Sequence, residues 1–226
     1  MIFKNNLIHK IKFTHTKEIY RGTSGDEFID YIEGDAMIED IDDGSHSVAG
    51  RISAHYVDIS GCDENQCSLI DVLDEVSHTL SEYIPFFNQK NEFSDSIYKS
   101  LNIDLKDGER KIWDNDGVLI FDTLDVEKKY RGEGIGNLLL DSVCYDYRRN
   151  SRFALLKAFP LQYVGSIDKD LDDKKKAKIE KEKIEFKNRN FETSRKKLVE
   201  LYKKSGFEII SGTEDFMVCD LRYKFD

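Results

Sequence analysis

A glycine-rich turn is the part of the sequence best suited to hold an anion. Its residues are Arg131, Gly132, Glu133, Gly134, Ile135 and Gly136, and an apolar segment with helical periodicity begins at Ile135. Glycines at alternating positions let successive backbone N–H groups turn inward without obstruction by a Cβ atom. The start of a helix adds the positive end of its dipole. Such a turn suits a pyrophosphate.

Two common phosphate-binding motifs do not match this turn. The dinucleotide fingerprint G-x-G-x-x-G, started at Gly132 or Gly134, would need a glycine where the chain has Asn137 or Leu139. A P-loop would need Gly-Lys-Ser/Thr, and no such tripeptide follows. A strand-to-helix connection with no ligand stays the alternative to a binding turn.

A third motif fits. Arg131-x-x-Gly134-x-Gly136 resembles motif A of the GNAT superfamily of acyl-CoA-dependent N-acyltransferases, which has Arg or Gln, two residues, Gly, one residue, then Gly or Ala. Farther along, Leu198-Val-Glu-Leu-Tyr202-Lys-Lys-Ser-Gly206-Phe207 is similar to motif B, in which a helix bearing Leu-Tyr ends in Gly-Phe. The resemblance covers residues 117–164 and 193–221, and it extends to a hairpin at 36–59.

The resemblance implies an α/β fold of the mixed α+β kind. A central mixed, mostly antiparallel sheet would be flanked by helices, and residues 1–226 would form a single domain. Helical insertions are expected at about 60–116 and 165–192. The second is strongly charged, and a solvated helix is its simpler interpretation, with a lid or a partner-binding segment as the alternative.

Hydrophobic periodicity predicts the elements. Strands are expected at 7–13, 36–41, 47–59, 118–121, 153–159, 207–210 and 216–221. Helices are expected at 68–87, 94–101, from 135 onward, at 168–190 and at 193–205. Residues 26–32 fit either a short helix or a strand, and 102–116 are expected to form a loop.

The resemblance also implies how a co-substrate would bind. Backbone amides of Arg131, Gly132, Glu133, Gly134, Ile135 and Gly136 would hold the pyrophosphate of acetyl-CoA. Leu124, Asp125 and Val126, at the end of the preceding strand, would pair with its pantetheine arm. That strand would splay from the strand at 153–159, with the thioester between them. No metal is expected.

Direct transfer to an amine needs a base for the ammonium and a proton donor for the departing thiolate. Tyr202 matches the motif B position that donates to the sulfur, and a tyrosine that merely packs its helix on the sheet is the alternative. Asp122, a carboxylate in an otherwise apolar strand, is the first candidate for the base. Asp125 and His55 are second choices, and a salt-bridged Asp122 stays open.

Charge and composition limit the partners. The formal net charge is −10, although residues 168–204 hold 14 basic against 9 acidic residues. An acidic body argues against nucleic acid and suits an amine acceptor, either a small molecule or a protein lysine or N-terminus. No apolar run reaches bilayer length, and the four cysteines lack zinc-ligand spacing.

The sequence therefore predicts a cytoplasmic N-acyltransferase, with acetyl as the expected acyl group. The rival interpretation is a catalytically inactive acyl-CoA-binding or regulatory module. A homodimer stays open.

Overall fold

A seven-stranded sheet organises the computed structural model, which describes residues 8–16, 26–39, 44–104, 117–160 and 191–224. The strand order is β1-β2-β3-β4-β5-β7-β6, and β4 runs parallel to β5, whereas every other neighbouring pair is antiparallel. The strands are β1 (Ile8–Thr16), β2 (Ile29–Glu39), β3 (His46–Asp58), β4 (Gly117–Val126), β5 (Ser151–Lys157), β6 (Glu208–Ile209) and β7 (Phe216–Asp220). The predicted mixed, mostly antiparallel sheet is confirmed.

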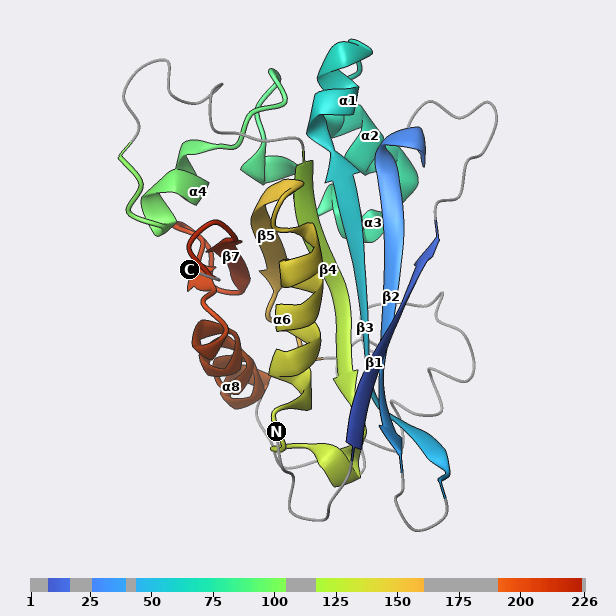
Figure 1. Ribbon diagram of the computed structural model, residues 1–226. Coiled ribbons are helices and arrows are strands. Elements are labelled where there is room, and N and C mark those ends of the chain that lie inside the picture. Colours follow the sequence, from blue (N-terminus) through green and yellow to red (C-terminus); the bar gives the residue numbers. More distant parts are fainter. Residues whose placement is uncertain (1–7, 17–25, 40–43, 105–116, 161–190, 225–226) are drawn as a thin grey trace.

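Helices cover both faces of the sheet. On one face lie α6 (Ile135–Tyr147) and α8 (Phe191–Lys204), and Figure 1 shows α6 running along β4. The other face is covered by short helices from the segment between β3 and β4. These are α1 (Ile59–Glu64), α2 (Leu69–Val76), α3 (His78–Ser81), the 3-10 turn η2 (Ile84–Phe86) and α4 (Asp95–Ser100). Two further 3-10 turns, η1 (Asp26–Phe28) and η3 (Lys128–Tyr130), precede β2 and α6.

The first half of β4 is buried on both sides because alternate side chains enter two different apolar cores. Leu119 and Phe121 belong to the core under α6 and α8. Val118 and Ile120 belong to the core under the inserted helices. This explains the uninterrupted apolar run in the sequence, and it confirms the predicted central strand.

The prediction of one continuous helix over 68–87 is wrong. The structure divides the segment into α2, α3 and η2. Ser77 has an extended backbone, with φ −159° and ψ 150°, and its hydroxyl accepts a hydrogen bond from the Leu80 N–H at 3.1 Å. Ser77 therefore starts a new helix, and Pro85 stands near the start of η2. Leu69, Val72, Leu73 and Leu80 are nevertheless all buried, because the short helices turn these apolar side chains inward.

Other boundaries differ less. β2 begins at Ile29 instead of Ala36, because Ile29 and Ile32 are buried and pair with β3. The predicted helix 168–190 lies outside the described residues, as does most of the loop 102–116. Gly206 ends α8 with a φ of +82°, as its place before Phe207 predicted. In the described part of the chain, no helix is both long and apolar enough to cross a membrane.

Candidate active site

The parallel pairing between β4 and β5 covers only the first part of β4. It runs from Gly117 to Ile120, opposite Ser151 to Leu155. β5 pairs with β7 along its other edge, and β4 continues beyond Ile120 to Val126 with β3 as its partner. On the side toward β5, residues 121–126 of β4 therefore pair with none of the described strands. This open edge leaves backbone donors and acceptors that an extended ligand can use.

A β-bulge lies next to the point where the pairing ends. Ala54 pairs with Phe121 and Ser53 pairs with Thr123, so Asp122 is the extra residue in β4. The Ser53 hydroxyl lies 3.3 Å from Oδ2 of Asp122, to which it can donate, and 2.6 Å from Oγ1 of Thr123. Asp122 is half-buried. A bulge re-aims the side chain it carries, and here it carries the carboxylate predicted as the base.

Asp122 lies near two ionisable rings from the neighbouring strands. The rings of Tyr31 on β2 and His55 on β3 are 5.2 Å apart. Burial lowers the pKa of His55, while the Asp122 carboxylate acts in the opposite direction. Within the described residues, Nδ1 of His55 is buried without a hydrogen-bond partner. Burial raises the pKa of Tyr31, and the charge on Asp122 also contributes. The strands thus bring Asp122 together with His55, the second-choice base.

The glycine turn leads directly into the start of α6. Gly132 and Gly134 have φ values of +89° and +82°, which favour glycine, and a Cβ on either would meet nothing within 4 Å. Gly134 is also the N-cap of α6, and no side chain among the described residues caps this helix end. The first N–H groups of α6 have no partner within the helix. An anion at this turn can therefore approach several backbone donors at once.

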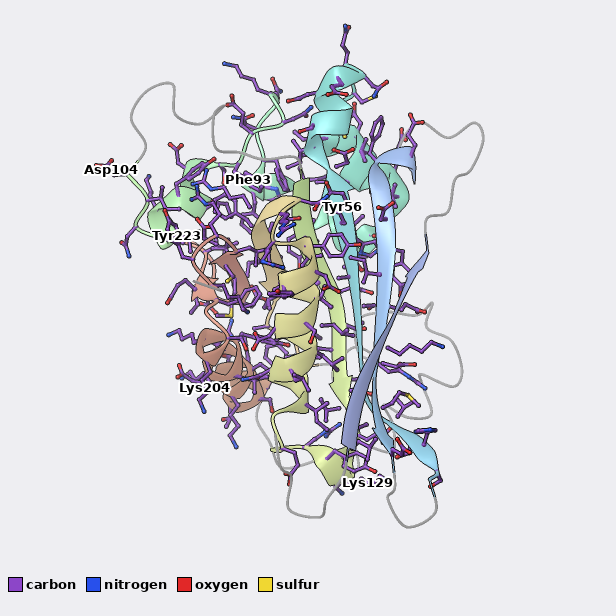
Figure 2. The ribbon with its side chains drawn as sticks, viewed as in Figure 1. Tyr56, Phe93, Asp104, Lys129, Lys204 and Tyr223 are labelled. Atoms are coloured by element: carbon purple, nitrogen blue, oxygen red, sulfur yellow. The ribbon has the colours of Figure 1, made fainter. Side chains whose placement is uncertain are left out.

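The turn is fixed to the end of β4. Nε of Arg131 donates a hydrogen bond to the carbonyl oxygen of Val126 at 2.8 Å, and Nη2 lies 3.6 Å from Oδ1 of Asp125. The hydroxyls of Tyr130 and Ser47 are 3.2 Å apart, which links the turn to β3. Figure 2 shows Lys129, just before the glycines, at the end of the molecule where β4 finishes. Residues 124–126 and 131–136, predicted as one binding surface, are therefore contiguous.

Tyr202 lies on the α6 side of the sheet, near the same point of β4. Its side chain is buried, and its ring is 6.4 Å from that of Phe207, which is in turn 6.2 Å from the ring of Phe121. The turn after α8 sets this arrangement, because the N–H of Phe207 bonds back to the carbonyl of Tyr202 at 3.1 Å. Burial raises the pKa of Tyr202 to about 12. Its hydroxyl therefore stays protonated at ordinary pH.

One residue near this site has no signal in the sequence. Tyr83 belongs to the inserted segment, and its hydroxyl donates a hydrogen bond to the carbonyl of Phe121 at 3.4 Å. In the sequence it is one more aromatic residue in an amphipathic stretch. Its place depends on how the inserted helices fold over β4 and β5.

Among the described residues there is neither a candidate metal site nor a disulfide. In the part of the chain that the structure describes, no group of three or more His, Cys, Asp or Glu side chains could hold a metal ion. The four cysteines, Cys62, Cys67, Cys144 and Cys219, are free thiols.

Comparisons with known proteins give limited matches. No protein-family model matches the chain, and a search of curated proteins finds no match. Among solved structures, NAA60 from Arabidopsis thaliana, in complex with acetyl-CoA, is 13% identical, with a TM-score of 0.41, and the match covers 85% of this chain and 77% of that one.

An apo form of a mutant agmatine N-acetyltransferase is 10% identical, with a TM-score of 0.31. That match covers 59% of this chain and 53% of the other, so this chain spans about half the length of that protein. Neither likeness is strong enough to assign residues. The chain's own features are the strand order, the single parallel pair, the early end of that pair and the glycine turn at the start of α6. The mixed, mostly antiparallel sheet with helices on both faces matches the fold that the resemblance in motifs A and B implied.

Proposed function

We propose that the protein is an N-acyltransferase that moves an acyl group, acetyl in our proposal, from acyl-CoA directly to an amine. One observation carries the proposal: the uncapped glycine turn directly follows the open edge of β4. An anion-binding end and an unpaired strand edge are thereby continuous. CoA has the complementary shape, since its pyrophosphate leads into a pantetheine arm that carries amides able to pair with a strand edge.

The donor would bind along this surface. Backbone N–H groups of residues 131–136 hold the pyrophosphate, and the dipole of α6 adds to their attraction. Leu124, Asp125 and Val126 supply backbone partners for the pantetheine arm. The thioester then lies near Phe121 and Asp122, where β4 leaves β5. In this proposal the reacting carbonyl lies between the two catalytic side chains, which come from opposite faces of the sheet.

The acceptor would approach from the face that carries the inserted helices. Asp122 accepts the proton that the ammonium must lose before it attacks, and Ser53 holds the carboxylate in place. Glu33 on β2 adds negative charge to the same region of the sheet. A cationic amine, on a small molecule or on a protein, suits this environment.

Tyr202 would act on the leaving group from the opposite face. Because burial raises its pKa to about 12, the hydroxyl remains a hydrogen-bond donor throughout the range in which an amine is acylated. Such a donor stabilises the negative charge that develops on sulfur as the thioester bond breaks. The transfer needs no acyl-enzyme, so no nucleophilic serine or cysteine is required.

A binding module without turnover is the second candidate. The observation that favours it is the burial of Tyr202 against Phe207, because a purely structural tyrosine would pack in the same way. This candidate predicts acyl-CoA binding without acyl transfer.

An assay of thiol release from acetyl-CoA tests the proposal. The acceptors would be small primary amines, polyamines, lysine-containing peptides and peptides with free N-termini. We expect thiol release that depends on the amine, together with a mass increase of one acetyl group on the acceptor. Binding of acetyl-CoA with no acylated product in any arm would favour the binding module. Absence of both binding and product would rule out both candidates.

A further inference from the structure

The inserted segment bridges β4 and β5 at the point where they separate. Tyr83 reaches β4, where its hydroxyl donates to the carbonyl of Phe121, the first residue beyond the paired part of the strand. Its neighbour Glu82 reaches β5, where Oε2 lies 2.8 Å from Nζ of Lys157. Two consecutive residues thus hold the two diverging strands from the same face.

The space around this bridge is filled by aromatic side chains. Tyr83 is only 1% exposed, and its ring makes edge contacts with Phe86 at 6.2 Å and with Phe216 at 5.3 Å. Phe86 and Phe216 also contact each other, at 5.0 Å. Where β4 and β5 separate, the open edge of β4 is therefore bounded on this face by aromatic rings. The ring that reaches β4 is that of Tyr83.

The proposed catalytic groups lie near the same hydroxyl. Burial raises the pKa of Tyr83 well above its ordinary value, and Glu82, Asp122 and Tyr202 all act in the same direction. Asp122 stands on the bulge of β4, and Tyr202 approaches from the opposite face of the sheet. Tyr83 therefore stands at the end of the site where the acyl group of the donor would lie.

We propose that Tyr83 closes the acyl end of the site and restricts the donor to short acyl groups. The inference rests on the proposed function. The ring of Tyr83 is the barrier, and its packing against Phe86 and Phe216 holds that barrier beside the diverging strands. In this proposal the acetyl group would lie in front of the ring, and each further methylene would have to displace the ring.

Calorimetric titration with acetyl-CoA, butyryl-CoA, hexanoyl-CoA and free CoA tests this without requiring turnover. For the wild type we expect butyryl-CoA to bind at least about tenfold more weakly than acetyl-CoA, because a filled pocket discriminates by roughly this factor against added methylenes. Tyr83→Leu and Tyr83→Ala should reduce that ratio to about one, by relieving the block on the longer chains. Tyr83→Phe keeps the ring and should keep the ratio.

Phe87→Ala is the matched control. Phe87 belongs to the same inserted segment and is also buried, and its ring packs on Phe93 at 5.2 Å, away from the bridge to Phe121. The Phe87→Ala substitution leaves a cavity comparable to that of Tyr83→Ala. It should therefore lower thermal stability in the same way and yet leave the acyl-length ratio unchanged. Tyr83→Leu removes less volume, and it provides a second measurement if the alanine variant does not fold.

The outcomes separate the two proposals. A wild type that binds CoA but does not discriminate by acyl length would overturn this inference alone. A ratio that is equally large in the wild type and in Tyr83→Leu would do the same. A folded wild type that binds neither acetyl-CoA nor free CoA would overturn the proposed function, and this inference with it.

Discussion

Nε of Arg131 donates a hydrogen bond to the carbonyl oxygen of Val126 at 2.8 Å, so the glycine turn is tied to the last residue of β4. The two parts of the proposed donor site therefore move together. In this account the arginine side chain positions the turn, and the backbone amides bind the pyrophosphate.

Arg131→Ala should weaken acetyl-CoA binding with little change in thermal stability. The lost hydrogen bond holds the turn in its binding conformation, and a contribution of about 1 kcal/mol to that conformation corresponds to roughly fivefold in affinity. Calorimetric titration and thermal unfolding of the same preparation measure both quantities. Arg149→Ala removes an exposed arginine beyond the other end of α6, and it should change neither. Equal affinities for wild type and Arg131→Ala would show that the tie does not position the turn.

Tyr202→Phe should lower kcat by about 10²-fold and leave the affinity for acetyl-CoA nearly unchanged, because the hydroxyl acts on the leaving group. Steady-state kinetics with titration of the donor measure both quantities. Tyr147→Phe is a useful control, because burial also raises the pKa of Tyr147 to about 12, although Tyr147 packs on Tyr56 instead of facing the open edge. A kcat within about twofold of the wild type in Tyr202→Phe would remove the assigned role.

The raised pKa of Tyr202 also makes a prediction about alkaline pH. In the unfolded chain a tyrosine ionises near pH 10, and in the fold Tyr202 ionises near 12. The stability that this difference contributes is fully present below about pH 10 and is lost as the pH rises through 12. Denaturant unfolding at a series of alkaline pH values should therefore show a shallower loss of stability in Tyr202→Phe than in the wild type. Parallel losses would contradict the burial of this hydroxyl.

Asp122→Asn should reduce kcat by about 10²-fold or more, because the amide cannot accept the proton of the ammonium. Asp35→Asn is the matched control, since Asp35 lies on β2 and pairs with Arg51 at 3.3 Å. The same kinetic comparison should include His55→Gln. A larger loss in His55→Gln than in Asp122→Asn would transfer the role of base to the histidine.

His55 gives a separate prediction about acid pH. Burial lowers its pKa, so the folded protein prefers the neutral ring, and the unfolded chain takes up a proton more readily. The stability that neutral His55 contributes is present above about pH 6.5 and is lost as the pH falls toward the lowered folded value. Between about pH 7 and pH 5, urea unfolding should show a smaller loss of stability in His55→Gln than in the wild type. An identical loss in the two proteins would exclude a buried, neutral His55.

The glycine turn was predictable because its geometry is local. Gly132 and Gly134 have positive φ values, and glycine is the residue type that adopts such values without strain, so the residue types themselves indicate the turn. The buried alternation of β4 was predictable for the same reason, since side-chain period follows backbone geometry.

The catalytic arrangement was not predictable in the same way. The end of the β4–β5 pairing at Ile120 and the bulge at Asp122 depend on register, which is set by three strands together. The apolar periodicity favoured one continuous helix, but the helix is interrupted at Ser77, because the serine side chain caps a new helix. The hydrogen bond from Tyr83 to Phe121 depends on this division of the segment into short helices. Local patterns thus predicted the elements and the donor turn, and tertiary packing decided which side chains meet at the open edge.

Titration of acetyl-CoA into the wild type and two glycine variants shows whether the turn at the start of α6 binds the donor. Gly134→Asp places a negative charge on the turn, whereas Gly212→Asp places one in the loop between β6 and β7. Both glycines have positive φ values, +82° and +89°, with open space around a Cβ, so the backbone strain is matched. We predict saturable binding to the wild type and to Gly212→Asp, and at least about tenfold weaker binding to Gly134→Asp, because the carboxylate would repel the pyrophosphate. Equal affinities in the two variants, or a folded wild type that binds neither acetyl-CoA nor free CoA, would contradict the account.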